Sequence, residues 1–230
     1  MFFGHSPALW AQFPQLVPGV LVATGIHADA EPCLQPWYAR ARERLSRGPE
    51  SELAEVSAWR RAFAQMGFKP TQYRSAGEAL LRRFRRENEL PRLHPLIDLC
   101  NALSLAYALP VAAFDLSGVD GELEVRHAVG GEEHTAWSGE VERAEPGEVI
   151  FVDAANHAHA RRWTFRQSRR STVSAGTRDV LLVAEGLHPT AAHDVSTLLD
   201  DLARSIEALW GAPAERAVLS AGAPRLELRP

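Results

Sequence analysis

The stretch that decides the fold is Leu90–Glu133, which reads LPRLHPLIDLCNALSLAYALPVAAFDLSGVDGELEVRHAVGGEE. Its first part predicts an apolar helix over Pro95–Tyr107, which Pro110 closes off. Val111–Leu116 and Glu122–His127 then carry extended patterns, with turn residues between them. This change from a helical period to an extended one within a single stretch predicts a domain that mixes helices and strands.

Polar side chains interrupt the apolar character of this stretch. The predicted helix carries Asp98, Asn101 and Ser104, and the first strand ends at Asp115. Polar groups on a buried face are costly unless they form hydrogen bonds. They therefore indicate either a polar network in the core or a binding pocket. The full set of pocket candidates is Asp98, Asn101, Ser104, Asp115, Glu122, Glu132 and Glu185.

The rest of the chain extends the same mixed pattern. Further helices are predicted over Pro36–Gly48, Ser51–Gly67 with Ser51 as N-cap, Ala76–Asn88 and Ala191–Trp210, and further strands over Pro18–Thr24, Glu148–Asp153, Ala160–Phe165 and Asp179–Glu185. No repeat or linker divides the chain. We expect one α+β domain over residues 1–230, with its core at about 19–210 and a loosely held tail over 211–230.

Composition narrows the class of protein. The 230 residues are 46% hydrophobic and 23% charged, which is typical of a globular domain. No apolar run approaches the roughly 20 residues of a membrane span, so no membrane association is predicted. The two cysteines, Cys33 and Cys100, do not make a disulfide framework. A reduced cytoplasmic protein is the expectation.

Common catalytic and metal-binding motifs are missing from the sequence. It contains no GxSxG, Walker, GxGxxG, HExxH or CxxC pattern. Cys100 reads as an apolar core cysteine rather than a nucleophile. His157 and His159 flank Ala158 and could share a metal ion, but a zinc site normally needs a third protein ligand. We therefore predict solvated histidines, no metal site and no cofactor.

A basic and aromatic cluster lies in the last third of the chain. Its members are Arg161, Arg162, Trp163, Phe165, Arg166, Arg169 and Arg170. Arginines for phosphates and aromatic rings for bases are typical of an RNA-contacting edge. The net charge of −4 argues against nucleic-acid binding over the whole surface. An ordinary solvated strand and loop explains the cluster equally well.

The order of several fragments resembles a known family. PTQYRS, PLIDLCN, the strand end FDL, GGE, PGEVIFVD and RRW follow one another as they do in the B3/B4 domain. That domain is the editing module in the β chain of bacterial phenylalanyl-tRNA synthetase, and it also occurs in free-standing proteins. The resemblance implies a three-layer α+β domain with a sandwich-like mixed sheet flanked by helices. It also implies hydrolysis of misacylated tRNA in trans, by water attack on the aminoacyl ester.

The resemblance suggests roles for individual residues. Asn101 and Glu132 would orient the amino group or the water, and the backbone N–H groups of Gly130 and Gly131 would face the ester oxygen. The acceptor end of tRNA is the expected partner. The predicted substrate- and tRNA-binding residues are Arg74, Ser104, Asp115, Arg161, Arg162 and Trp163. The synthetase pocket distinguishes a tyrosine hydroxyl, but no matching histidine and glutamate pair stands out here, so the amino acid stays open.

Two other functions remain compatible with the sequence. One is a non-catalytic RNA-binding module, which would bind tRNA in a salt-sensitive way without hydrolysing the ester. The other is a small-molecule hydrolase or amino-acid-binding protein without an RNA partner, which the net charge of −4 also suits.

Overall fold

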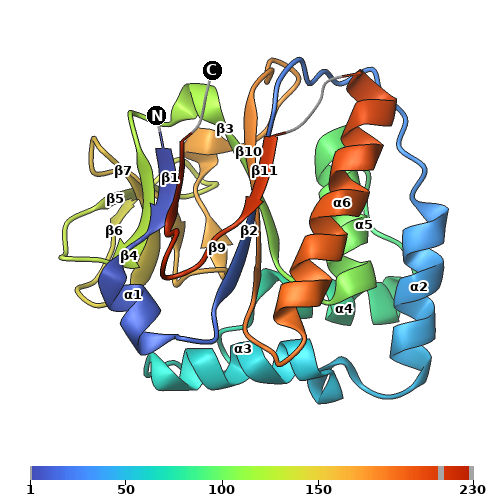
Figure 1. The fold of residues 1–230 in the computed structure, drawn as a ribbon, viewed down its shortest axis with the longest axis horizontal. Coiled ribbons are helices and arrows are strands. Elements are labelled where there is room, and N and C mark those ends of the chain that lie inside the picture. Colours follow the sequence, from blue (N-terminus) through green and yellow to red (C-terminus); the bar gives the residue numbers. More distant parts are fainter. Residues whose placement is uncertain (1, 212–214, 228–230) are drawn as a thin grey trace.

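Two β-sheets packed face to face form the centre of the computed structural model, which describes residues 2–211 and 215–227 (Figure 1). The larger sheet has the strand order β12 (Arg225–Glu227), β1 (Phe2–His5), β4 (Leu123–His127), β7 (Val149–Asp153), β8 (Ala158–Arg161) and β9 (Arg166–Gln167). The smaller has the order β11 (Glu215–Val218), β2 (Val17–Ala23), β10 (Val180–Gly186) and β3 (Val111–Asp115). The larger sheet is mixed, because β1 runs parallel to β4 and antiparallel to β12.

Strand β10 shows why the molecule is layered. Its residues are all buried, because alternate side chains enter two different cores. Leu181 and Val183 face the larger sheet, whereas Leu182 and Ala184 pack under helices. A strand that is apolar on both faces must be covered on both, so helices, small sheet and large sheet form three successive layers.

The helices cover the outer face of the smaller sheet and one end of both sheets (Figure 1). Helices α5 (Pro95–Tyr107) and α6 (Ala191–Trp210) lie on the small sheet, and α2 (Gln35–Ser46) and α4 (Ala76–Glu87) pack beyond α5. Helix α3 (Ala54–Gln65) lies across the end and inserts Trp59 and Phe63 between the sheets. The remaining elements are α1 (Pro7–Gln12), the ribbon of β5 (Glu133–Thr135) and β6 (Val141–Arg143), and the short helices η1 (Glu50–Glu52), η2 (Leu116–Gly118) and η3 (Arg169–Ser171).

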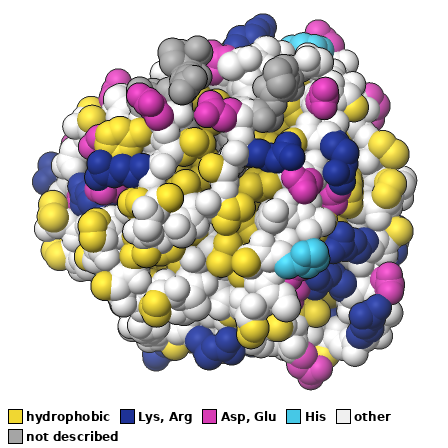
Figure 2. Space-filling view, in the orientation of Figure 1, with side chains coloured by type: hydrophobic (Ala, Val, Ile, Leu, Met, Phe, Trp, Pro, Cys, Tyr) yellow, Lys and Arg dark blue, Asp and Glu magenta, His cyan; other side chains and the backbone are white. Residues whose placement is uncertain are grey.

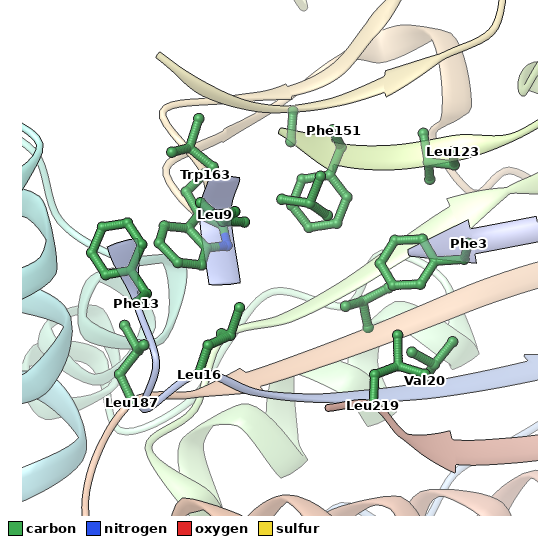
Figure 3. Close-up of a cluster of buried hydrophobic side chains, with 14 of the residues drawn as sticks. Phe3, Leu9, Phe13, Leu16, Val20, Leu123, Phe151, Trp163, Leu187 and Leu219 are labelled. Atoms are coloured by element: carbon green, nitrogen blue, oxygen red, sulfur yellow. The ribbon is translucent and has the colours of Figure 1, made fainter. Parts of the chain in front are cut away.

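Aromatic and branched side chains fill the space between the sheets. Phe3, Val20 and Leu123 meet at one end, and Phe13 and Trp163 meet at the other (Figure 3). The Phe13 and Trp163 rings pack edge to face, with centroids 4.9 Å apart and an interplanar angle of 63°. Edge-to-face packing of this kind fixes ring orientation as well as burying area. The end of the sandwich near Trp163 is therefore rigidly built.

The α+β architecture confirms the predicted fold class, and α5 and α6 have the predicted boundaries. The helix predicted from Ser51 begins later, at Ala54, because Ser51 lies within η1 and Leu53 precedes the helix instead. The strand predicted over Ala160–Phe165 is also corrected. It ends at Arg161, because the next two residues adopt positive φ angles and turn the chain.

Both ends of the chain contribute more structure than the sequence suggests. β1 and α1 precede the predicted core. Beyond Gly211, β11 pairs with β2 and β12 pairs with β1. Within the stretch expected to be a loosely held tail, residues 215–218 and 225–227 are strands of the two sheets. Both segments are short, and pairing with strands distant in sequence forms them.

The exposed surface carries both signs of charge. Figure 2 shows acidic and basic side chains interspersed over the face that contains α6. This mixing agrees with the small net charge of −4. In the described ranges 2–211 and 215–227, every helix is too short or too polar to cross a bilayer.

Candidate functional site

A cavity of about 80 Å³ lies between the two sheets. The small sheet contributes residues from β3 and β10, and the large sheet contributes residues from β7, β8, β9 and the β8–β9 turn. Pro110 before β3 and Ala76 at the start of α4 complete the lining. The lining residues are Ala76, Pro110, Val111, Ala112, Phe114, Phe151, Ala160, Trp163, Thr164, Phe165, Arg166, Gln167, Val183 and Glu185. An apolar cavity with a few polar groups is the usual form of a small-molecule site.

The β8–β9 turn positions Trp163 in the wall of this cavity. Arg162 and Trp163 adopt φ angles of 49° and 59°, a backbone conformation that residues other than glycine rarely adopt. The N–H of Trp163 donates to the carbonyl of Val149 at 2.6 Å, and the indole is fully buried. Strained backbone of this kind is concentrated at functional sites. The strain is the first observation that directs attention to this cavity.

Glu185 is the buried acid of the cavity. The indole Nε1 of Trp163 lies 3.0 Å from both carboxylate oxygens, and Nε2 of His5 lies 2.8 Å from Oε1. A carboxylate can accept about four hydrogen bonds. Glu185 therefore retains acceptor capacity beyond these two partners, and it is one of the lining residues of the cavity. Two fixed partners hold it in place, so it is poised to accept from an ammonium group or a water.

Thr164 offers a hydroxyl with no hydrogen-bond partner among the described residues. Thr164 is a lining residue of the cavity, its Oγ1 is buried, and its carbonyl accepts from the N–H of Ala76 at 2.8 Å. Gln167, also in the lining, donates from Nε2 to the carbonyl of Ala113 at 2.7 Å. An unpaired buried hydroxyl costs free energy that a bound ligand would recover.

Arginines surround this part of the molecule, but acids pair with them. Arg166 lines the cavity and contacts Glu142 at 2.9 Å. Arg162 lies over the Tyr73 ring at 4.7 Å and 3.4 Å from Glu148. Arg74, a predicted phosphate ligand, lies 3.3 Å from Glu78. The edge that reads as basic in the sequence is therefore partly neutralised.

Two members of the predicted RNA edge are buried. Arg161 forms two hydrogen bonds with Glu148, at 2.8 and 2.7 Å, and a third with Glu142. Trp163 is fully buried as well. Neither side chain has the exposure that a phosphate or a stacked base requires. The structure gives both a place inside the protein instead.

The predicted catalytic turn, residues 130–132, uses its polar groups in hydrogen bonds within the protein. Glu132 is fully buried and accepts from Arg126 at 2.7 Å and from the N–H groups of Val129 and Gly130 at 2.8 and 2.9 Å. Burial raises the pKa of Glu132, but these hydrogen bonds outweigh it and lower the pKa below its usual range. The N–H of Gly131 donates to the carbonyl of Ala144 at 3.4 Å. Both glycine N–H groups are thus occupied, and none of the three residues lines the cavity.

The polar residues of α5 also lie outside the cavity. Asn101 is half-buried, and Ser104 donates to the carbonyl of Leu109 at 2.5 Å. Figure 1 places α5 and β5 on opposite sides of the molecule, so Asn101 and Glu132 do not share one pocket. Asp115 accepts from Ser117 and from Thr177, the latter at 2.5 Å. Asp98 accepts from the N–H of Leu93. These residues stabilise turns and helix ends.

A serine, a histidine and an aspartate form a chain of hydrogen bonds at β7 and β8. Ser171 Oγ lies 2.8 Å from His159 Nδ1, and His159 Nε2 lies 3.0 Å from Asp153 Oδ2. These distances suit a catalytic triad. However, Ser171 and His159 are both 0% exposed, so no substrate reaches the hydroxyl. This chain of hydrogen bonds is a buried polar network.

Hydrogen bonds set the charge of Asp153. Burial raises its pKa, but hydrogen bonds from His159 and from the N–H groups of His157 and Asp120 lower it well below the ordinary range. The side chain of His157 adds a further contact at 3.2 Å. The expectation of two solvated histidines is thus wrong for His159, which is fully buried.

Two groups of side chains have the composition of metal ligands. Asp120, Asp153 and His157 lie within 4.8 Å of one another, as do Glu55, His188 and Asp194. Protein donors already serve most of these acids. Asp153 accepts from two histidines, and Glu55 accepts from Arg44 at 2.7 Å. The geometry therefore gives neither group a metal-binding assignment.

Cys100 is a core residue, as the sequence predicts. It is buried on α5, and burial raises the pKa of its thiol to about 12. A thiol with such a pKa supplies almost no thiolate at neutral pH.

Sequence reasoning found part of the cavity. Glu185 is among the pocket candidates and does line it, and Trp163 is predicted as a binding residue and forms its wall. Thr164 and Gln167 were missed, because a threonine and a glutamine in a predicted strand look ordinary. His5 was missed because β1 itself was not predicted. Only the pairing of β1 with β4 brings it to Glu185.

Comparison with known proteins identifies the family. The sequence model of the B3/4 domain matches residues 58–202, which is more than half of the chain. The chain therefore belongs to the B3/4 domain family, which confirms the resemblance. The search of curated proteins finds no match.

One solved structure to which the chain is similar is an N-terminal fragment of the phenylalanyl-tRNA synthetase β-subunit from Pyrococcus horikoshii. It is 9% identical, with a TM-score of 0.44, and the match covers 94% of this chain and 53% of that one. The chain thus spans about half the length of that fragment.

Proposed function

We propose that the inter-sheet cavity binds the aminoacyl end of a misacylated tRNA and that the protein hydrolyses the ester by water attack. The observation that carries this proposal is the buried carboxylate of Glu185, which retains acceptor capacity in a cavity beside an unpartnered hydroxyl. An aminoacyl group offers the matching chemistry, namely an ammonium donor and an ester carbonyl. Family membership supports the choice of an aminoacyl ester over other esters.

The reaction needs little machinery. An aminoacyl ester is already activated, so a positioned water and a donor to the developing oxyanion are sufficient. Among the described residues, the lining of the cavity includes no serine, cysteine or histidine. The Thr164 hydroxyl of the lining has no hydrogen-bonded base among the described residues, which favours direct attack by water over a covalent intermediate. In the proposed roles, Glu185 holds the ammonium group or the water and Thr164 donates to the ester oxygen.

The tRNA would reach the cavity past the half-exposed arginines. Arg74, Arg162 and Arg166 retain between 19% and 37% of their side-chain exposure, although each contacts an acid. Phosphate groups would compete with Glu78, Glu142 and Glu148 for these guanidinium groups. Arg161, buried with two acids, is left out of this role. A cytoplasmic location is part of the same proposal, since the substrate is made there.

A deacylation screen tests this proposal. Purified protein is mixed with one tRNA charged in turn with different amino acids, and loss of the ester is followed against the uncatalysed rate. Acceleration for at least one aminoacyl-tRNA supports the proposal. If every ester decays at its uncatalysed rate, the hydrolase proposal is abandoned.

The pairing of arginines with acids favours a second candidate, an amino-acid-binding protein without an RNA partner. In that case free amino acids bind the cavity, and tRNA does not. Titration of uncharged tRNA at low and high salt separates the candidates, because phosphate contacts produce a steep salt dependence.

A further inference from the structure

We infer that the cavity takes a small amino-acid side chain with a hydroxyl group, of the serine and threonine class, and excludes phenyl and phenol rings. The inference rests on the proposed function and names its substrate class. The first argument is size. The cavity volume is about 80 Å³. An apolar cavity of roughly 150 Å³ binds one benzene ring in another protein. The present cavity has about half that volume, so a ring enclosed by it would displace the walls.

The walls are fixed by packing on their far side. The Trp163 ring meets Phe13 and Trp59 edge to face, each at a centroid distance of 4.9 Å, and its N–H is held by Glu185. Phe114 and Phe151 contact each other across the sheets at 5.2 Å. Close-packed interiors resist the shifts that a larger ligand would require. The walls of the cavity should therefore keep their positions when a ligand binds.

The polar atoms of the cavity discriminate among substrates whose amino-acid side chains are small. Thr164 Oγ1 is buried without a partner among the described residues, and Glu185 accepts from His5 and Trp163 with acceptor capacity to spare. A hydroxyl beside the ammonium group would give a second donor and acceptor to these atoms. Serine and threonine supply one, and valine of similar size does not. Leaving buried polar groups unpaired is what makes a site reject the analogue that lacks a hydroxyl.

Phe165 lines the cavity and packs against the periphery of the core. It is half-buried, and its ring meets Tyr73 at 5.2 Å. Phe68 offers a matched control. It is also half-buried and contacts the same Tyr73 ring at 5.2 Å, but it does not line the cavity.

Deacylation of one tRNA charged with serine, threonine, phenylalanine or tyrosine tests the inference. For the unaltered protein we expect kcat/KM to be at least about 10-fold higher for serine and threonine, since even one methylene changes discrimination by 10-fold or more. Phe165→Ala should raise kcat/KM for the phenylalanyl and tyrosyl esters at least about 10-fold relative to kcat/KM for the seryl ester. Phe68→Ala should leave this ratio unchanged. Phe165→Leu serves where the alanine variant does not fold. Equal or faster hydrolysis of the aromatic esters by the unaltered protein overturns the inference.

A binding measurement separates this inference from the proposed hydrolysis. Adenosine carrying serine or tyrosine through a non-hydrolysable 3′-amide is titrated by calorimetry. Tighter binding of the seryl compound supports the size limit even if no ester is hydrolysed. Equal affinities, or no binding of either compound, overturn it. The hydrolase proposal fails separately, when binding occurs and every ester survives.

Discussion

Two buried polar networks of this protein contain the same kinds of groups and differ in access. At the cavity, Glu185 accepts from His5 and Trp163 and borders open space. At β7–β8, Asp153 accepts from His159, which contacts Ser171, and both of those partners are fully buried. Judged by its hydrogen-bond distances alone, the Asp153 network resembles a catalytic site more closely than the cavity does. By access, only the first can meet a substrate.

The comparison teaches that satisfied and unsatisfied groups distinguish the two networks. In the Asp153 network the carboxylate accepts at least four hydrogen bonds from within the protein. In the cavity, Thr164 has a buried hydroxyl without a partner among the described residues. Complete satisfaction rigidifies a core, whereas a missing partner marks the place for a ligand.

Asp153→Ala should have the largest effect, and the effect should fall on stability. The substitution leaves His159, His157 and the N–H of Asp120 without an acceptor, and each unpaired buried group costs roughly 1–3 kcal/mol. We expect urea unfolding to show a loss of about 3 kcal/mol or more. Asp120→Ala, at an exposed carboxylate, is the control. A variant as stable as the parent would refute a structural role for this network.

Glu185→Gln should act on catalysis. The amide keeps an acceptor for Trp163 but loses the charge that holds an ammonium group or a water. Deacylation should fall about 10²-fold, the usual cost of one positioned electrostatic group, with unchanged circular dichroism. Glu122→Gln, at an exposed carboxylate, is the matched control. If Glu185→Gln retains full activity, the cavity is not the reaction site.

Acid should weaken the Asp153 network. The folded-state pKa of Asp153 is lowered, so its stabilising contribution is complete above the ordinary pKa of about 3.9 and is lost as the pH falls below it. Stability should then drop by up to about 1.4 kcal/mol per pH unit from this group. Asp153→Asn, measured in the same series, should show a shallower dependence. Parallel curves for the two proteins would contradict the assigned pKa direction.

Ser171→Ala sharpens the comparison most directly. The serine contacts His159 but is sealed from solvent. We expect a loss of about 1 kcal/mol in the free energy of unfolding, the usual net value of one hydrogen bond, and deacylation equal to that of the parent. Loss of activity in a folded variant would show that the network opens and acts as a triad.

Asn101→Ala should have the smallest effect. Asn101 lies half-buried on α5, away from the lining of the cavity. Deacylation and stability should both stay within about 0.5 kcal/mol of the parent. A large fall in kcat would restore the catalytic role that its place in the sequence suggests.

Local patterns predicted much of the fold. The apolar helix Pro95–Tyr107 and the buried strand at Asp179–Glu185 follow from proline positions and β-branched runs, and the structure has both elements. Elements of three or four residues, such as β1 and β12, escaped, because they contain too little pattern and form only by pairing. The turn at Trp163 escaped for another reason. Its positive φ contradicts the local preference of both residues, and tertiary contacts impose it.

The sequence by itself determined the class of the domain, its layered helices and strands, and Glu185 as one of several candidate acids. It did not distinguish the acids, because composition cannot show which carboxylate is already satisfied. Tertiary structure decided that question. It closed Glu132 into a turn and Asp153 into a sealed network, and it left Glu185 beside a cavity. The physical reason is that hydrogen-bond satisfaction and solvent access depend on neighbours distant in sequence, such as His5 for Glu185.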